Sequence, residues 1–466
     1  MLTLRDPRLG FGRREFLRIG GLGLGGMSLA NLLAAQSNAA SSGSRRGIQD
    51  RSVIFLFMHG GPTQFETFDP KMDAPVGIRS VTDEIPTSIP GVTFGGTYEK
   101  LAKLANRLTI VRSYVPGDAK HDIKPIVSNQ TLNANLGSLY SRVAGTTHPI
   151  TGMPTCALVG PQSVADDTQS ITKGFGNLGS TGTLGQAFAP FMPGAGGALQ
   201  QSMELAIPRD RLDDRRSLLT RLDALKRTFD AGGQLEGMDK FQAQAFQTIL
   251  SGVSSALDLK KEDPKVIDRY DTSGLVHPNS IKRQYNNYKN YVDHGKTLGK
   301  MLLLARRLCE AGCGFVTITS GFVWDNHADN NNVGVYDGAH YCGLPFDHAV
   351  STFLEDLRER GLSDKILLVC TGEIGRTPKI NARGGRDHWG NLAPLMLAGG
   401  GMPRGRVVGQ STRDGGEPQS ERVGIENLVS TIMHSVLDVP KVRLFTNLPA
   451  ELQRLITESE PIPGLS

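Results

Sequence analysis

The chain has few cysteines and few aromatic side chains for its length. Only 5 of its 466 residues are cysteine, and 6% are aromatic. The cysteines show no C-x-x-C spacing, which argues against a zinc ribbon, a redox motif or a disulfide framework. They stand at positions 156, 309, 313, 342 and 370, where burial as small apolar side chains is their expected role.

Long hydrophobic runs are also missing beyond the first forty residues. No later stretch stays apolar over the width of a bilayer, so we expect no stable insertion into a membrane. A content of 39% hydrophobic and 21% charged residues excludes global disorder. The length suffices for one large α/β core or two ordinary domains.

The body of the chain carries little net charge. Of the total of +5, residues 1–39 contribute +3 through five arginines and two acidic residues, which leaves +2 for the remainder. No basic stripe interleaved with aromatic residues is present either. Nucleic acid is therefore not an expected partner.

Residues 1–40 have the order of a twin-arginine export signal. Arg13 and Arg14 are followed by the apolar, glycine-rich stretch 19–33 and then by small residues at 37–40. The alternative is a first helix of the folded domain, but the glycines of this stretch make a poor helix. We expect the mature chain to be free in the periplasm or an equivalent exported space.

Beyond residue 50, apolar runs alternate with helical patterns. This alternation predicts a doubly wound α/β sheet with helices on both faces. The expected strands are 53–58, 108–111, 155–159, 315–319, 366–370 and 395–398. The expected helices are 98–106, 209–230, 238–259, 297–311, 346–360 and 425–437.

One domain is expected over residues 50–440. Charged residues at about 205–262 show helical but no strand patterns, and they predict a helical insertion or cap over the sheet. Prolines at 449, 461 and 463 interrupt the stretch 441–466, which we expect to be a loosely packed C-terminal tail.

Polar clusters flank four of the expected strands. In open α/β sheets ligands collect at the carboxyl ends of strands, so these clusters are candidates for one shared site. Each cluster alone also has an ordinary explanation as a turn or a surface ion pair, and Asp69 before Pro70 is better explained as a turn. The candidate residues are Asp69, Asp325 with His327, Glu373 with Arg376, and Asp387 with His388.

The same four clusters carry a resemblance to a known family. They are Gly60-Gly61-Pro62 through Asp69-Pro70-Lys71, Trp324-Asp325-x-His327, Gly372-Glu373-x-Gly375-Arg376-Thr377-Pro378, and Gly385-Arg386-Asp387-His388-Trp389. Together they resemble a large family of exported bacterial proteins with twin-arginine signals. That family is described as a sulfatase-like domain of unknown function within the alkaline phosphatase superfamily.

The resemblance implies an alkaline-phosphatase-like three-layer αβα sandwich. It also implies one or two divalent metal ions, with zinc, calcium and manganese all left open. By the order of ligands in that superfamily, it assigns metal binding to Asp69, Asp325, His327, Glu373 and His388, while Asp387 either orients His388 or binds directly. Glu373 departs from the pattern, because an Asp-His pair normally stands there.

The implied activity is hydrolysis of a phosphate or sulfate ester, carried by a small molecule or a polysaccharide, with Arg376 steadying the anion. No cysteine lies in a C-x-P-x-R string, which argues against a formylglycine sulfatase. Ser113 is the candidate nucleophile, although a helix or turn cap explains it equally well. His121 is a candidate ligand or acid, or a packing residue. The alternative is a non-catalytic member that binds a metal or an anion.

Overall fold

The computed structural model describes residues 47–194 and 253–465 of the protein. The expected signal segment, residues 1–40, lies outside the described residues, as does most of the expected insertion at 205–262. The described end of that insertion is helical, since α8 spans Val253–Leu257 and a 3-10 turn spans Leu259–Lys261.

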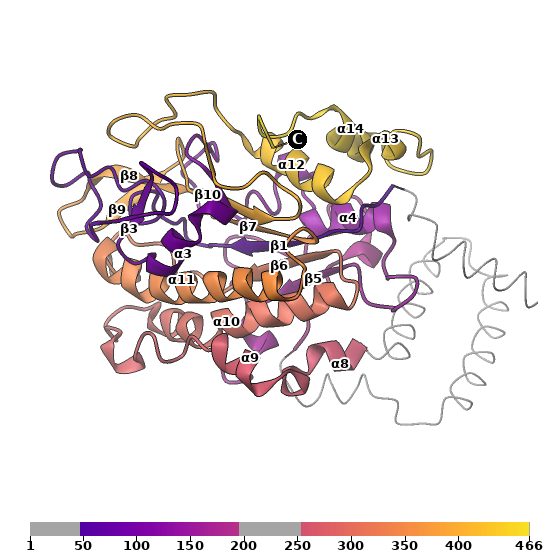
Figure 1. The fold of residues 1–466 in the computed structure, drawn as a ribbon, viewed down its shortest axis with the longest axis horizontal. Helices are drawn as coiled ribbons and strands as arrows, with labels where there is room; N and C mark the ends of the chain where they lie inside the picture. Colours follow the sequence, from indigo (N-terminus) through magenta and orange to yellow (C-terminus); the bar gives the residue numbers. More distant parts are fainter. Residues whose placement is uncertain (1–46, 195–252, 466) are drawn as a thin grey trace, which may run out of the picture.

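A seven-stranded sheet forms the centre of the fold (Figure 1). Its strands are β1 (Ser52–Phe57), β4 (Leu108–Val111), β5 (Cys156–Val159), β6 (Phe315–Thr319), β7 (Ile366–Thr371), β10 (Leu395–Gly399) and β11 (Arg406–Val408). They lie in the order β11-β4-β10-β7-β1-β6-β5. The six strands predicted from apolar runs are confirmed to within one residue at each end, and the edge strand β11 was missed.

Helices cover both faces of this sheet (Figure 1). Alternate residues of a strand point to opposite faces, so Ile54 and Leu56 of β1 pack into one core while Val53 and Phe55 pack into the other. The first core includes α3 (Glu99–Lys103), α10 (Tyr288–Glu310) and α11 (Val335–Glu359), and the second includes α4 (Leu136–Ala144), α12 (Ile425–Val436) and α14 (Ala450–Glu458). The predicted three-layer α/β fold is thus confirmed.

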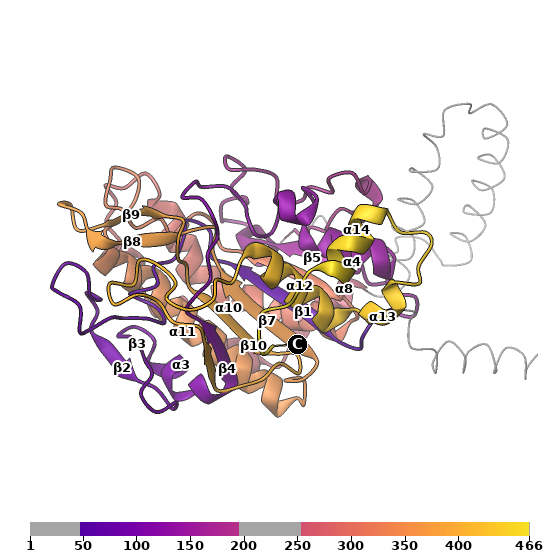
Figure 2. The same cartoon turned by 90° about the horizontal axis from the view of Figure 1, so that it is seen from above.

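Smaller elements complete the described chain. Two short hairpins lie outside the main sheet, β2 (Glu84–Pro86) with β3 (Thr93–Gly95) and β8 (Gly375–Ile380) with β9 (Arg386–Trp389). The remaining α-helices are α9 (Pro264–Arg269) and α13 (Val439–Val442). Figure 2 shows the β8–β9 hairpin and the helices α13 and α14 at opposite ends of the molecule.

Strand β10 runs against its neighbours, which the sequence did not predict. It is antiparallel to β4 and β7, whereas the other strands of the sheet are parallel to their neighbours. The amino end of β10 therefore lies at the edge where the parallel strands have their carboxyl ends. For this reason a polar cluster that precedes β10 reaches the same edge as clusters that follow β1, β6 and β7.

The C-terminal stretch packs more tightly than its composition predicts. Leu452 and Ile456 of α14 are fully buried, and Ile462 beyond them is buried as well. All three belong to the second core, so the stretch 441–465 is part of the folded body. None of the helices in the described part of the chain is long and apolar enough to cross a membrane.

Candidate metal centre

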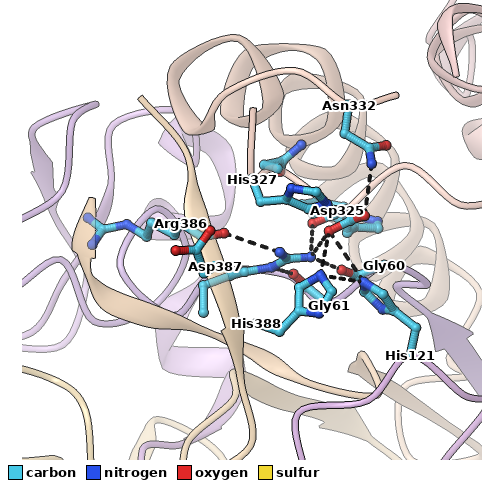
Figure 3. A network of polar contacts seen from close by, with 12 residues as sticks. Gly60, Gly61, His121, Asp325, His327, Asn332, Arg386, Asp387 and His388 are labelled. Atoms are coloured by element: carbon cyan, nitrogen blue, oxygen red, sulfur yellow. Dashed lines mark hydrogen bonds and ion pairs between the residues drawn. The ribbon is translucent and has the colours of Figure 1, made fainter. Parts of the chain in front are cut away.

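Three potential metal ligands converge at the carboxyl edge of the sheet. The Nε2 atoms of His121 and His388 lie 2.9 Å apart, and each lies 3.3 Å from Oδ1 of Asp325. These three residues are the group of described histidine, cysteine and acidic side chains whose ligand atoms lie close enough to hold one ion. Figure 3 shows His121 and His388 beside the Asp325 carboxylate.

The three ligands come from separate parts of the chain. His121 lies in an irregular loop after β4, Asp325 in the loop after β6, and His388 on β9. The Lys124 ammonium ties the first loop together, because it donates to Asp118 at 2.9 Å and to Asp122 at 3.1 Å. Packing of these loops at one sheet edge brings together residues that are far apart in sequence.

The spacing of the triangle fits a metal ion. Zinc bonds to imidazole nitrogen and carboxylate oxygen are about 2.0–2.2 Å long, which at tetrahedral angles separates two ligand atoms by about 3.3 Å. Nδ1 of His121 donates to Glu373 at 2.7 Å, so Nε2 is the nitrogen that would give up its proton and present a lone pair when a metal ion binds. The two separations from Asp325 Oδ1 equal this value, and the two imidazole nitrogens lie closer, at 2.9 Å. The donor chemistry and the distances to Asp325 therefore suit a divalent cation.

Glu373 contacts Nδ1 of His121, the ring nitrogen that faces away from the triangle. Its carboxylate is fully buried, accepts from Nδ1 of His121, and also accepts from the backbone N–H of Gly60. Burial acts to lower the pKa of His121, but its bonds to Asp325 and Glu373 outweigh burial and raise that pKa. A carboxylate bonded to the second nitrogen of a metal-binding histidine fixes the tautomer and the orientation of the ring.

Asp325 is held on both oxygens. Oδ1 accepts from Nη2 of Arg376 at 2.7 Å, and Oδ2 accepts from Asn332 at 2.8 Å and from His327 at 3.1 Å. Burial acts to raise the pKa of Asp325, but the Arg376 guanidinium and the hydrogen bonds of the surrounding histidines hold it far below its ordinary value. This carboxyl group is therefore ionised and fixed in orientation.

The Arg376 side chain donates its hydrogen bonds to acceptors within the protein. It is fully buried, and besides Asp325 it donates to the carbonyls of Gly60, Gly61 and Arg386. The sequence predicted an anion clamp at this position. In the structure the guanidinium instead ties the loop after β1 to the carboxylate of the candidate site.

Three other predicted site residues do not join the triangle. Asp69 is paired with Lys71 at 3.3 Å and with Arg112 at 3.4 Å. Asp387 is exposed and accepts from Asn381 at 2.9 Å, and Figure 3 shows it on the other side of the strand from His388. Ser113 is fully buried, and its hydroxyl lies against Gly409.

A pocket of about 350 Å³ opens onto the triangle. His327 lines it together with the three candidate ligands. Its other walls come from the loop around Thr172, the start of α10 and the loop after β6, and they include Thr172, Phe175, Asn287, Asn290, Phe322, Asp329, Asn331 and Asn332. Neither phenylalanine nor Asn332 was assigned to the site from the sequence, because nothing in an irregular loop indicates which side chain will face a distant strand end.

Solved structures that resemble this chain include three hydrolases. A sulfatase from Pseudoalteromonas sp. is 12% identical, with 87% of this chain and 70% of that chain covered and a TM-score of 0.36. A phosphonate monoester hydrolase from Silicibacter pomeroyi is 11% identical, with 89% and 78% covered and a TM-score of 0.31. An alkaline phosphatase from the Antarctic bacterium TAB5 is 11% identical, with 77% of this chain and 94% of that chain covered and a TM-score of 0.27.

Comparison with curated protein sequences gives no match. A protein family model, by contrast, covers most of the sequence and the whole of the candidate centre. The family is described as "Protein of unknown function (DUF1501)", and its model matches residues 50–465. The chain belongs to this family.

Proposed function

We propose that this protein is an exported, divalent-metal-dependent hydrolase of a phosphate or sulfate ester. The observation that carries the proposal is the triangle of two imidazole nitrogens and one carboxylate oxygen at 2.9–3.3 Å, open to a pocket. Three protein ligands with an open fourth position are typical of catalytic zinc sites. The ester chemistry is supported by the resemblance to the alkaline phosphatase superfamily.

The ligand set favours zinc among the candidate metals. Two of the three ligand atoms are imidazole nitrogens, which suit zinc, whereas calcium takes six to eight oxygen ligands. His121 Nε2, His388 Nε2 and Asp325 Oδ1 are the atoms that hold the ion in this proposal. A metal ion at this place supplies a Lewis acid that polarises the ester.

His327 is the proton-transfer group of the proposal. Its Nε2–H donates to Asp325 Oδ2 at 3.1 Å, which leaves the Nδ1 lone pair of this pocket-lining ring to take a proton. Water attacks the phosphorus or sulfur atom, its proton passes to His327, and the bond to the alcohol oxygen breaks. The same proton then neutralises the departing alkoxide, so the products are an alcohol and inorganic phosphate or sulfate.

One observation favours a second function, a non-catalytic metal-binding or anion-binding module. The sequence suggested Ser113 as the nucleophile, but its hydroxyl is buried against Gly409, and Ser113 is not among the residues that line the pocket.

Thr172 is a residue of the pocket wall that carries a hydroxyl group, and it is therefore a second candidate nucleophile. A Thr172→Val variant that retains turnover favours attack by water, and abolished turnover favours attack by Thr172.

Export is proposed from the order of residues 1–40. Fractionation of cells that produce the full chain, with and without Arg13→Lys and Arg14→Lys substitutions, tests it. We expect the protein in the exported fraction only when both arginines are present, and equal distribution of the two forms would contradict export by this pathway.

The test of hydrolysis is turnover of an aryl phosphate and an aryl sulfate by the zinc-loaded full chain. We expect turnover that is lost in His327→Ala and in His388→Ala. His340→Ala is the matched control, because His340 lies on α11 and bonds to the Tyr336 carbonyl instead of the site. Tight zinc binding without turnover of either ester would favour the binding module.

A further inference from the structure

The pocket beside the triangle has an unusual balance of charge. None of the described residues that line it is lysine or arginine, and its side chains of fixed charge are the carboxylates of Asp325 and Asp329. The rest of the lining consists of histidine, amide, hydroxyl and aromatic side chains. Without the metal ion, the potential cations that the described part of the wall offers are its imidazole groups.

The nearest buried arginines are already paired. Arg376 compensates Asp325 at 2.7 Å, and Arg386 binds Glu66 at 3.1 Å. Both guanidinium groups are fully buried. Neither is free to meet a second negative charge on a substrate, because moving it would leave a buried carboxylate without its partner.

Asp329 is the second carboxylate of the pocket wall, and no lysine or arginine of the described residues pairs with it. Its Oδ1 accepts from the backbone N–H groups of Asn331 at 2.8 Å and Asn332 at 2.7 Å, and its nearest ionisable partner is His327, at 3.8 Å. His327 lies between this carboxylate and that of Asp325. A carboxylate fixed in this place repels further negative charge at the metal centre.

We propose that the site selects an ester that carries a single negative charge, a sulfate monoester or a phosphate diester, over a doubly charged phosphate monoester. The inference rests on the proposed function, because the ion that attracts the ester is the one held by the triangle. One negative charge is attracted by that ion. A second charge meets Asp329 and finds no lysine or arginine among the described residues of the pocket wall, so its desolvation is not offset.

The organic part of the ester has an apolar surface available. Phe175 and Phe322 stack with ring centroids 4.4 Å apart, and Phe322 also meets the His121 ring edge-on at 4.8 Å. Both phenylalanines line the pocket next to the triangle. Ligands with a phenyl group therefore suit the site, and they allow charge to be varied while the organic group stays constant.

The first experiment measures binding to the zinc-loaded full chain by calorimetry. Benzenesulfonate carries one charge, and phenylphosphonate carries two at about pH 8.5. We expect benzenesulfonate to bind about tenfold more tightly, and we expect Asp329→Asn to remove most of this difference. Asp364→Asn is the control. Asp364 lies just before β7, at the opposite edge of the sheet, where it pairs with Arg404.

The second experiment compares kcat/KM for three esters of 4-nitrophenol: the sulfate, the bis-aryl phosphate diester and the phosphate monoester. Intrinsic reactivity differs among them, so the measured quantity is the change between wild type and Asp329→Asn. We expect kcat/KM for the doubly charged monoester to rise about tenfold relative to both singly charged esters. Comparison of kcat/KM for the sulfate and for the phosphate diester shows which of these two singly charged esters the site prefers.

The outcomes separate the two proposals. If the chain binds no zinc, or zinc-loaded chain turns over none of the esters, the proposed hydrolase fails and this inference fails with it. If esters are hydrolysed but phenylphosphonate binds as tightly as benzenesulfonate, the charge selection is overturned and the hydrolase stands. A preference that is unchanged in Asp329→Asn also overturns the inference.

Discussion

Nδ1 of His121 lies 2.7 Å from Oε1 of Glu373, and the backbone N–H of Gly60 donates to the same carboxylate. This contact joins the loop after β4 to the ends of β1 and β7. It orients the His121 ring so that Nε2 faces His388 and Asp325. The sequence suggested Glu373 as a metal ligand, whereas its observed contacts are those of a residue that positions a ligand.

Replacement of this carboxylate is expected to weaken metal binding without abolishing it. Glu373→Gln keeps the size of the side chain but removes the charge that holds the His121 ring, so zinc affinity should fall about 10–100-fold. A competition titration against a chromophoric chelator measures the affinity. Glu417→Gln, at an exposed residue that accepts from Asn391, is the control and should leave affinity unchanged. Equal affinity in wild type and Glu373→Gln would show that the contact has no positioning role.

Gly60 is expected to be intolerant of a side chain. Its φ is +110°, and a Cβ atom there would lie 2.5 Å from the backbone nitrogen of Asp325. Gly60→Ala should lower the free energy of unfolding by about 3–5 kcal/mol, because backbone strain adds to a clash between two site loops. At Gly185, with φ of +96° and open space around it, alanine should cost about 1–2 kcal/mol. Urea unfolding measures both, and equal costs would rule out the clash.

Arg306 is expected to be essential for stability. It is 1% exposed and pairs with Glu262 and Glu310 at 2.5 Å and with Asp356 at 3.0 Å. Arg306→Met removes the buried guanidinium of this network and leaves the three carboxylates to Arg360, which pairs with each of them but is partly exposed. We expect a cost of about 3 kcal/mol in urea unfolding, the lower end of what a broken buried pair costs.

The control for this substitution is a surface arginine. Arg404 forms an exposed ion pair with Asp364 at 2.5 Å. Arg404→Met should change the free energy of unfolding by about 0–1 kcal/mol, because exposed pairs are screened by water. If the two substitutions cost the same, the buried network contributes nothing beyond a surface pair.

Asp347 is expected to give the stability a pH dependence. It accepts from the backbone N–H groups of Lys100 and Leu101 in the first turn of α3, and burial raises its pKa to about 6. Since this pKa is higher in the folded than in the unfolded chain, the stabilising contribution is present below about pH 4 and is lost as the pH rises through about 6.

The measurement is urea unfolding of wild type and Asp347→Asn at several pH values. The asparagine cannot titrate, so the free energy of unfolding of wild type relative to the variant should decline between about pH 4 and pH 7. A difference that stays constant over this range would contradict the raised pKa.

The strands were predictable because buried parallel strands are continuous apolar runs between glycine-rich or polar loops. The convergence of Asp325 and His388 followed from the same pattern, since polar residues at strand ends meet at one sheet edge. His121 could be suggested but not assigned, because its loop has no periodic pattern. Its role depends on contacts with Glu373 and Asp325, more than two hundred residues away in sequence.

The partners of individual charged side chains were not predictable from the sequence. Asp69 has the motif position of a ligand, but Arg112 and Lys71 lie beside it in the fold. Arg376 likewise follows a strand end as an anion clamp would, yet Asp325 and backbone carbonyls occupy its guanidinium. Which charges pair is decided by loop packing, and a local motif does not contain that information.

The most direct test of the account is the metal content of the full chain after loading with zinc and removal of free ion. Mass spectrometry of the metal should find a stoichiometric amount of zinc in wild type and in the His340→Ala control. His121→Ala and His388→Ala should retain much less while giving the same circular dichroism spectrum, because each removes one ligand of the triangle. Wild type without bound zinc, or equal zinc in all four proteins, would contradict a metal centre at this edge of the sheet.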